Sequence, residues 1–508
     1  MGRHVKVIEK DNIDRRELGY YFTPAFVANY ISNRLLVLKP DGDKVLDPCV
    51  GKEELLETFF ARGKQVDGID VFRHKENYKC HFIQRDFVAF YEETKRNAEH
   101  TQLTMDDLLK ESHAKAELDY DYIIANPPYN CHEVDYIKNN KTALKNLFDD
   151  VGVHNMYSMF FSAIIDVAKE GAVIGLITYD SFFTAKAHTD LRRKILQECT
   201  IHEITMCPID LFHEQDADVR TSIIILQKGK KFQEGISIAN RPSNKKVFQA
   251  QLARQLDDYE TGIARQYTLE DIVLTNLNDN DEFIIECPDD IKVLFSEERL
   301  GEAFKCITGI STGKDELYLS KERKDPFTIP FYKNPGKNRF YTGNQLYLHK
   351  DFLKFDKEIK NFMVRNKPLL FQPGITCSSM GVAFTACRLP ENATYGVNAN
   401  IICEDEEAWW LLAYLNSGLV TYLVRGVMIR SNMITSGYVS RIPLLRVDEA
   451  AKSKLGEFAR TAHERAREGK SFQDVLENIN DFVYKQAGIS NETIAMIKRF
   501  NEDLIANT

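Results

Sequence analysis

The chain has 508 residues, of which 44% are hydrophobic and 28% are charged, and its formal net charge is −9. No apolar run reaches the roughly 18–20 residues that cross a bilayer, and the polar N-terminus lacks the apolar stretch of a secretory signal. The ten cysteines are scattered without a CxxC pair, which predicts a cytoplasmic protein without disulfides or a zinc site. No metal is expected, and the sequence leaves the oligomeric state open.

The first half of the chain alternates short apolar runs with helical patterns. Thr23-Pro24 is typical of a helix start, with an N-cap residue before a proline in the first helical position. Strands separated by helices predict an α/β fold, a Rossmann-like doubly wound parallel sheet with helices on both faces. The expected helices are 24–38, 53–62, 156–169 and 185–198, and the expected strands are 44–47, 65–70, 81–85, 121–126, 172–178, 201–207 and 221–227.

The pattern loosens after about residue 232, so the first domain is expected to end between 232 and 300. We place this domain at residues 1–285. Residues 286–446 are rich in Gly, Asn, Tyr and Phe with short strand-like runs, which predicts an α+β domain. Residues 447–508 have a helical period and predict a C-terminal helical tail, with helices at 450–469, 473–486 and 491–506.

Residues 121–129 form an apolar strand that ends in Asn126, Pro127, Pro128 and Tyr129. In open α/β sheets, ligands bind at the carboxyl ends of the strands. A polar residue, two prolines and an aromatic residue at such a strand end suit catalysis on an aromatic amine such as that of adenine. This exocyclic amine is a poor nucleophile, because its lone pair is delocalised into the ring. The side-chain oxygen of Asn126 and the carbonyl of Pro127 are suited to accept the two amine hydrogens, while the prolines stiffen the loop. Tyr129 is expected to stack on the base, and these four residues are the predicted catalytic site.

Asn-Pro-Pro-Tyr after an apolar strand resembles the fourth motif of the γ-class N6-adenine DNA methyltransferases, and the resemblance covers nearly the whole chain. It implies a class I methyltransferase fold, S-adenosyl-L-methionine as the methyl donor, and double-stranded DNA as the substrate. It also implies a flipped-out target adenine and a trailing target recognition domain. The chain then resembles a modification enzyme, either the companion of a separate restriction endonuclease or an orphan.

The same resemblance assigns residues to the cofactor. Thr23 would contact the methionine carboxylate, and the turn at Gly51 would wrap the methionine part. Asp70 would accept hydrogen bonds from the ribose hydroxyls, Asp86 would accept one from the adenine amine, and Phe87 would pack on the adenine ring. The full expected set is Thr23, Asp47, Pro48, Gly51, Asp70, Asp86 and Phe87.

One residue departs from the family pattern. The family usually has a second glycine two residues after Gly51, where this chain has Glu53. A side chain there would either crowd the cofactor or cap the following helix. This departure keeps open a DNA-binding homologue with weakened catalysis. A second alternative is an RNA or protein-glutamine methyltransferase, because both of these chemistries also use Asn-Pro-Pro-Tyr.

The α+β segment contains a basic region inside an acidic protein. Residues 321–367 hold 12 Lys and Arg against 5 Asp and Glu, interleaved with aromatic residues. Such interleaving suits phosphate contacts beside contacts to bases, although ordinary variation in surface charge explains it equally well. The residues expected to bind DNA are Lys314, Lys333, Lys337, Arg339 and Arg430.

Overall fold

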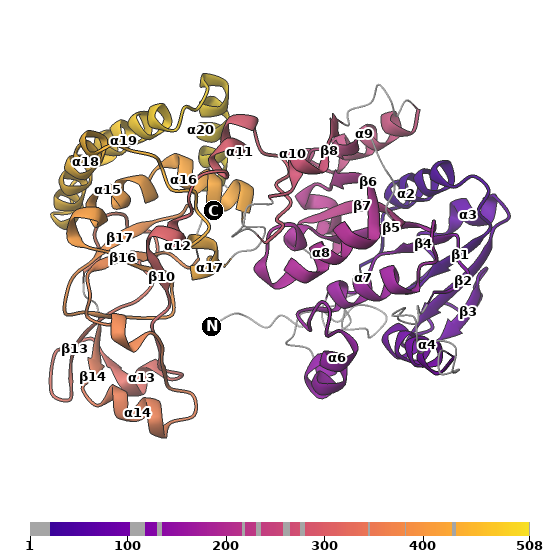
Figure 1. The fold of residues 1–508 in the computed structure, drawn as a ribbon, viewed down its shortest axis with the longest axis horizontal. Helices are drawn as coiled ribbons and strands as arrows, with labels where there is room; N and C mark the ends of the chain where they lie inside the picture. Colours follow the sequence, from indigo (N-terminus) through magenta and orange to yellow (C-terminus); the bar gives the residue numbers. More distant parts are fainter. Residues whose placement is uncertain are drawn as a thin grey trace, which may run out of the picture. The chain divides into compact units, whose positions relative to one another are not determined.

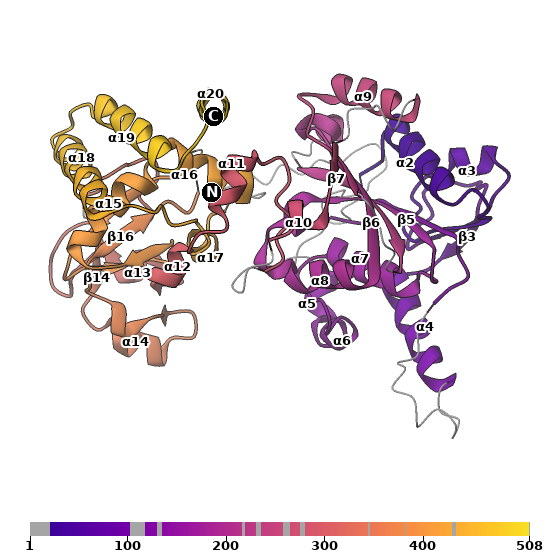
Figure 2. The same cartoon turned by 45° about the horizontal axis from the view of Figure 1, so that its top comes forward.

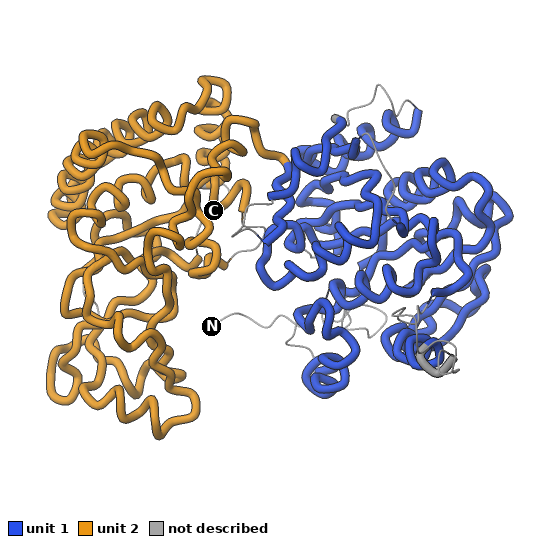
Figure 3. The backbone as a smooth tube through the Cα atoms, viewed as in Figure 1, with its two compact units in different colours: residues 1–285 blue, residues 286–508 orange. Residues whose placement is uncertain are grey.

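The structure is a computed structural model of the chain. It describes residues 21–101, 117–129, 135–215, 219–229, 235–257, 265–274, 280–343, 346–380, 383–428 and 433–506. The chain folds into two compact units, residues 1–285 and 286–508 (Figure 3).

Unit 1 is built on one large sheet. Among the described residues it has nine strands in the order β3-β2-β1-β4-β5-β7-β6-β8-β9. β7 runs antiparallel to both of its neighbours, and β9 is antiparallel to β8. The other strands are parallel, so their carboxyl ends lie at one edge. The strands are β1 (Lys44–Asp47), β2 (Gln65–Asp70), β3 (His81–Gln84), β4 (Tyr122–Ala125), β5 (Val173–Tyr179), β6 (Cys199–Met206), β7 (Thr221–Lys228), β8 (Ile236–Ala239) and β9 (Arg265–Tyr267).

Helices cover both faces of this sheet (Figure 1). One apolar core contains α2 (Ala25–Leu38), α3 (Glu57–Ala61) and α9 (Lys245–Asp257). The core on the opposite face contains α4 (Phe87–Thr101), α7 (Met156–Val167) and α8 (Thr189–Glu198). The short helices α5 (Asp135–Asn139), α6 (Lys141–Leu147) and α10 (Leu269–Ile272) complete the α-helices among the described residues of the unit.

The predicted doubly wound α/β fold is confirmed, with two differences. The sheet is mixed, because β7 is reversed, and an apolar run carries no information about strand direction. The segment after residue 232 also belongs to the sheet, since β8, α9 and β9 extend it. Its short strands and polar helix surface gave only a weak periodic signal.

Unit 2 is also mixed, with separate small sheets among its described residues. One has the order β10-β19-β16-β17, another has the order β12-β14-β13-β18, and β11 pairs with β15. The strands are β10 (Lys305–Ile307), β11 (Ile310–Ser311), β12 (Leu319–Ser320), β13 (Phe327–Tyr332), β14 (Leu346–His349), β15 (Met363–Val364), β16 (Gly374–Cys377), β17 (Ala386–Leu389), β18 (Thr394–Tyr395) and β19 (Asn400–Ile402).

The helices at the end of the chain pack within unit 2. α18 (Glu449–Arg467) lies against α15 (Asp405–Leu415) and α19 (Gln473–Gln486), as Figure 2 shows. α20 (Asn491–Ala506) lies against α16 (Gly418–Tyr422). The remaining α-helices of the unit are α11 (Asp289–Leu294), α12 (Leu300–Ala303), α13 (Asp315–Tyr318), α14 (Phe352–Glu358) and α17 (Ser436–Val439).

Among the described helices, none is long and apolar enough to span a bilayer alone. The helices Asp405–Leu415 and Gly418–Met428 reach that length and composition only together, with a bend of 66° between them.

Candidate functional site

Asn126 follows β4 at the carboxyl edge of the sheet. Its Nδ2 donates to the backbone oxygen of Tyr21 over 2.7 Å and to Oγ1 of Thr23 over 3.2 Å. Its Oδ1 accepts the hydroxyl of Tyr129 over 2.5 Å. These contacts determine which end of the carboxamide is the acceptor, and the second lone pair of Oδ1 remains for another donor. The structure thus brings together Thr23 and Asn126, two predicted site residues that are far apart in the sequence.

The two prolines after Asn126 provide a stiff loop without competing donors. Pro127 is buried and Pro128 is half-buried. Within the described part of the chain, no donor is hydrogen-bonded to the carbonyl oxygen of Pro127. This carbonyl is therefore a second acceptor adjacent in the chain to Asn126.

Tyr129 does not have the open position that its predicted role requires. The residue is only 5% exposed, and its ring stacks on Tyr179 with 4.5 Å between centroids and on Tyr21 with 5.9 Å. Burial raises the pKa of Tyr129 well above its ordinary value. The ring is packed among protein aromatics, so the expectation that it stacks on a base does not fit this arrangement. Its hydroxyl instead supports Asn126.

The loop after β1 contains the next predicted residues. Asp47 is 1% exposed, and its Oδ1 accepts the backbone N–H of Cys49 over 3.1 Å. Burial raises the pKa of Asp47 well above its ordinary value. A cation that binds beside this carboxyl would favour the ionised carboxylate and would in turn be stabilised by the negative charge. Pro48 is buried in the same loop, and Gly51 has a φ of +51°, which glycine adopts without strain.

Asp70 ends β2 and holds the neighbouring loop. Its Oδ2 accepts the N–H of Gly51 over 3.0 Å, and its Oδ1 accepts the N–H of Phe72 over 3.0 Å. Nε2 of His74 lies 3.4 Å from the same Oδ1. A carboxylate has about four acceptor positions, so Asp70 retains capacity for a further hydroxyl donor.

Asp86 lies directly before α4 and two residues after the end of β3, at the same carboxyl edge of the sheet. Its Oδ1 accepts the N–H of Val88 over 2.9 Å, and its Oδ2 accepts the hydroxyl of Tyr136 over 2.6 Å. These two bonds connect the helix start with α5.

Phe87 is a core residue, contrary to the prediction that it packs on a ligand ring. It is 2% exposed, and its ring lies 5.2 Å from that of Phe160 in α7. Two apolar residues that are exposed at this edge are Val71 and Phe72, which are 47% and 45% exposed. The signal for them was present in the sequence, because two apolar residues follow directly after the acidic residue that ends β2.

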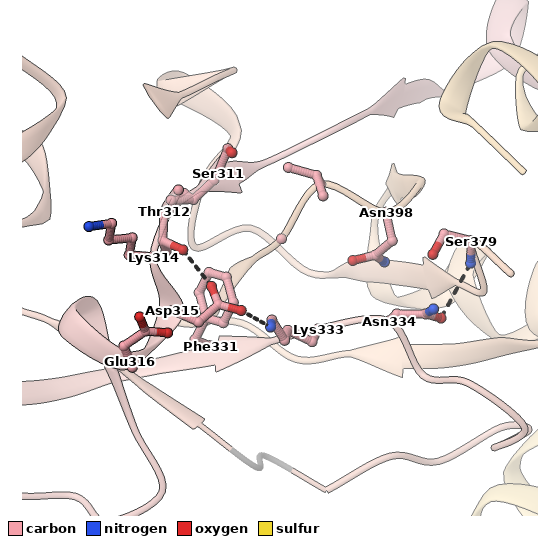
Figure 4. Close-up of a pocket in the computed structure, with 14 residues that line it drawn as sticks. Ser311, Thr312, Lys314, Asp315, Glu316, Phe331, Lys333, Asn334, Ser379 and Asn398 are labelled. Carbon is pink, nitrogen blue, oxygen red and sulfur yellow. Dashed lines mark hydrogen bonds and ion pairs between the residues drawn. The ribbon is translucent and has the colours of Figure 1, made fainter. Parts of the chain in front are cut away.

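A second candidate site is a groove of about 530 Å³ in unit 2 (Figure 4). Lys314 and Lys333 line it, and both are exposed. Lys333 forms an ion pair with Asp315, whereas Lys314 has no ion-pair partner among the described residues. Asn334 was not expected there: its Oδ1 accepts the N–H of Gly336 over 3.0 Å and that of Ser379 over 3.3 Å. With its oxygen held in this way, the amide nitrogen is the group left for a ligand.

The other predicted DNA-binding residues have different positions. Lys337 is exposed but does not line the groove. Arg339 is half-buried: its Nη1 donates to the backbone oxygen of the buried Asn416 over 2.6 Å, and burial lowers its pKa, so we expect it to stabilise the fold and not to contact DNA. Arg430 lies outside the described residues.

Comparisons with known proteins identify relatives in restriction–modification systems. The chain is 22% identical over 287 residues to the Type I restriction enzyme EcoEI methylase subunit of Escherichia coli, covering 51% of this chain and 56% of that one. It is 28% identical over 219 residues to the Type II methyltransferase M.BanIII of Aneurinibacillus aneurinilyticus, covering 39% and 36%. The matched region therefore spans about half or less of each relative's length.

Two solved structures share the fold of most of the chain. The Type IIL restriction-modification enzyme MmeI in complex with DNA has a TM-score of 0.55 at 10% identity, covering 97% of this chain and 80% of that one. A nuclease-deletion mutant of the Type ISP enzyme LlaGI in complex with a DNA substrate mimic has a TM-score of 0.52 at 11% identity, covering 88% and 55%.

The family assignment comes from a match to the N-6 DNA Methylase family model over residues 11–283, more than half of the chain. These residues include β1, β2 and β4 and the polar side chains at their carboxyl ends. For a methylase with this sheet, the methyl donor is S-adenosylmethionine. The chain belongs to the N-6 DNA methylase family.

Proposed function

We propose that the chain is a site-specific DNA methyltransferase that transfers a methyl group from S-adenosylmethionine to N6 of a flipped-out adenine in double-stranded DNA. The relatives named above support a role in restriction–modification, with a separate endonuclease as the partner or with none. Residues 1–285 would perform catalysis, residues 286–446 would recognise DNA, and residues 447–508 would support that recognition domain.

The observation that carries this proposal is the held carboxamide of Asn126. Its Nδ2 is bonded to Tyr21 and Thr23, so its Oδ1 is presented as an acceptor before the substrate arrives. Accepting one hydrogen of the adenine amine at Oδ1 and the other at the Pro127 carbonyl localises the nitrogen lone pair. Because these bonds strengthen as the amine gains charge, they lower the barrier more than they raise substrate affinity.

The residues at the neighbouring strand ends fit S-adenosylmethionine, which supplies an electrophilic methyl group on a sulfonium cation. Asp47 is a buried carboxyl that a nearby cation would ionise. Asp70 would accept ribose hydroxyls, and Asp86 would accept from the adenine amine. The exposed side chains of Val71 and Phe72 would cover the adenine ring, in place of the buried Phe87. The remaining contacts are assigned to Thr23, Pro48 and Gly51.

The groove of unit 2 is the proposed DNA contact. Lys314 and Lys333 would contact phosphates, which gives affinity but no sequence information. The oriented amide of Asn334 would donate to a base edge, and such contacts specify sequence. Base flipping is required because the amine of a paired adenine is inaccessible inside the duplex.

Mass spectrometry of nucleosides tests the proposal. Double-stranded DNA containing many sequences is incubated with the protein and S-adenosylmethionine, and then digested. The expected product is N6-methyladenine with the wild type, and much less of it with Asn126→Ala in the same incubation time. Methylcytosine without methyladenine, or methylation of RNA or protein alone, would contradict the proposal.

A further inference from the structure

Glu53 occupies a backbone conformation that glycine adopts more easily. Its φ is +69°, in the left-handed region where a side chain is strained. It stands where the resembling family usually has glycine, two residues after Gly51. The residue is nevertheless only 6% exposed, so this charged side chain is buried as well as strained. Such a position persists only where the surrounding contacts determine it.

The carboxylate of Glu53 binds the segment that joins β2 to β3. Its Oε1 accepts the backbone N–H of Lys79 over 2.8 Å and that of Cys80 over 2.7 Å. Its Oε2 forms an ion pair with Lys75. Burial opposes the charged form, but the hydrogen bonds from Lys75 and Cys80 outweigh it and lower the pKa of Glu53.

The same segment returns to the proposed cofactor loop. The hydroxyl of Tyr78 donates to the backbone oxygen of Gly51 over 2.9 Å and accepts the N–H of His74 over 2.9 Å. His74 faces Asp70, which in turn accepts the N–H of Gly51. The loop after β1 is therefore connected to segment 71–80 in two ways, through Tyr78 and through Asp70 with His74. Phe72 belongs to this segment.

Close packing beneath these contacts leaves little room for another arrangement. A Cβ added at Gly68 would lie 2.8 Å from Sγ of Cys80 and 2.8 Å from Cγ2 of Val50. The cofactor loop and segment 71–80 thus meet over a glycine of β2, and Glu53 provides the charged contact between them.

We infer that Glu53 is a positioning residue that holds segment 71–80 against the loop after β1, so that Asp70 and Phe72 are preformed for S-adenosylmethionine. The inference rests on the proposed function, because it concerns the same cofactor site. It also explains the departure from glycine, because the side chain points toward Lys75, Lys79 and Cys80 and holds them in place.

The test uses the full chain with Glu53→Gln and Glu53→Gly, and with Glu57→Gln as the control. Glu57 carries an equal charge on an exposed side chain and pairs with Lys79 outside the buried contact. Calorimetry with S-adenosylmethionine is expected to show a loss of about tenfold in affinity for both Glu53 variants and none for the control. In turnover assays, the KM for the cofactor is expected to rise while kcat at saturation changes little.

Hydrogen exchange gives a readout that does not need activity. The amides of Lys79 and Cys80 are expected to exchange faster in both variants, and cofactor binding is expected to restore part of their protection. If the wild type binds and both Glu53 variants bind equally well, the inference is overturned while the proposed function stands. If the wild type does not bind the cofactor, both are overturned. Should a Glu53 variant fail to fold, Lys75→Ala and Tyr78→Phe test the same contacts, and unchanged affinity in both would overturn the inference.

Discussion

The hydroxyl of Tyr129 donates to Oδ1 of Asn126 over 2.5 Å, so the last residue of the Asn-Pro-Pro-Tyr motif supports its first. The ring of Tyr129 stacks on those of Tyr21 and Tyr179, and the backbone oxygen of Tyr21 accepts a hydrogen bond from Nδ2 of Asn126. The stacked tyrosines Tyr21, Tyr129 and Tyr179 therefore also fix the orientation of the Asn126 carboxamide. This relationship separates two roles that the motif alone does not distinguish, an acceptor that touches the substrate and a tyrosine that positions it.

The two roles predict different kinetic effects. Asn126→Ala is expected to lower kcat by roughly 100-fold or more, because an acceptor that acts in the transition state is lost, and to leave cofactor affinity unchanged. Tyr129→Phe removes one hydrogen bond and is expected to lower kcat only about fivefold. Steady-state kinetics with calorimetry measures both. A Tyr129→Phe variant as inactive as Asn126→Ala would contradict the supporting role.

Asp70 is expected to affect the cofactor through its charge. Asp70→Asn should weaken S-adenosylmethionine binding about tenfold, since hydrogen bonds to a charged acceptor are the stronger ones. Asp70→Ala should weaken it further, because the N–H groups of Gly51 and Phe72 also lose their acceptor. Asp119→Asn is the control, as this exposed residue precedes β4 at the opposite edge of the sheet. Equal affinity in all three variants would mean that the cofactor binds elsewhere.

Phe72 is expected to have the cofactor contact that the family resemblance assigns to Phe87, and Phe87 is expected to act in the core. Phe72→Ala should weaken cofactor binding with little change in Tm, because the side chain is exposed at the sheet edge. Phe87→Ala should instead lower the free energy of unfolding by about 3–5 kcal/mol, as for other aromatic residues removed from a core. Thermal unfolding and calorimetry on both variants decide this, and a Phe87→Ala variant with wild-type stability would contradict the core assignment.

Much of the candidate site was predictable, because strand ends are marked locally. Asp47 and Asn126 each follow a short apolar run, and parallel strands bring these strand ends, together with Asp70 at the end of β2, to one edge. The direction of β7 was not predictable from its composition. Contacts distant in sequence were also missed, as Arg339 is held by Asn416, 77 residues later in the chain, and nothing in the basic segment indicates that partner.

The prediction for DNA binding concerns the exposed lysines of the groove in unit 2, because Arg339 is held by Asn416. Lys314→Glu with Lys333→Glu, the two lysines that line the groove, is expected to weaken DNA binding and make it less dependent on salt, because phosphate contacts release counterions. Lys454→Glu with Lys470→Glu changes the same charge on exposed residues of the same unit and is the control. Titrations at several salt concentrations measure the slope. A slope that changes equally in both pairs would remove the groove from the DNA contact.

Arg339→Gln is expected to act on stability. It leaves the backbone oxygen of Asn416 without its donor, which costs about 1–3 kcal/mol for a buried group. Denaturant unfolding measures this loss. An unaltered midpoint together with weaker DNA binding would restore Arg339 to the predicted DNA surface.

The last prediction concerns His188, which contacts Tyr157, a residue whose ring also packs against Tyr179. Its Nε2 lies 2.9 Å from the hydroxyl of Tyr157, and its Nδ1 is buried without a hydrogen-bond partner among the described residues. Burial, with the nearby charges of His154 and Arg192, lowers the pKa of His188 to about 3. Between the ordinary pKa of about 6.5 and this value, the unfolded chain binds the proton and the folded chain does not.

Stability must therefore fall as the pH decreases through that range, by up to about 1.4 kcal/mol per pH unit from this residue. His188→Gln removes the titrating group and keeps an amide that can meet Tyr157. The difference in unfolding free energy between wild type and His188→Gln, measured in urea from pH 7 to pH 4, should decline steadily below about pH 6.5. Parallel curves for the two proteins would mean that His188 is protonated equally in the folded and unfolded chains, and would contradict the lowered pKa of this buried histidine.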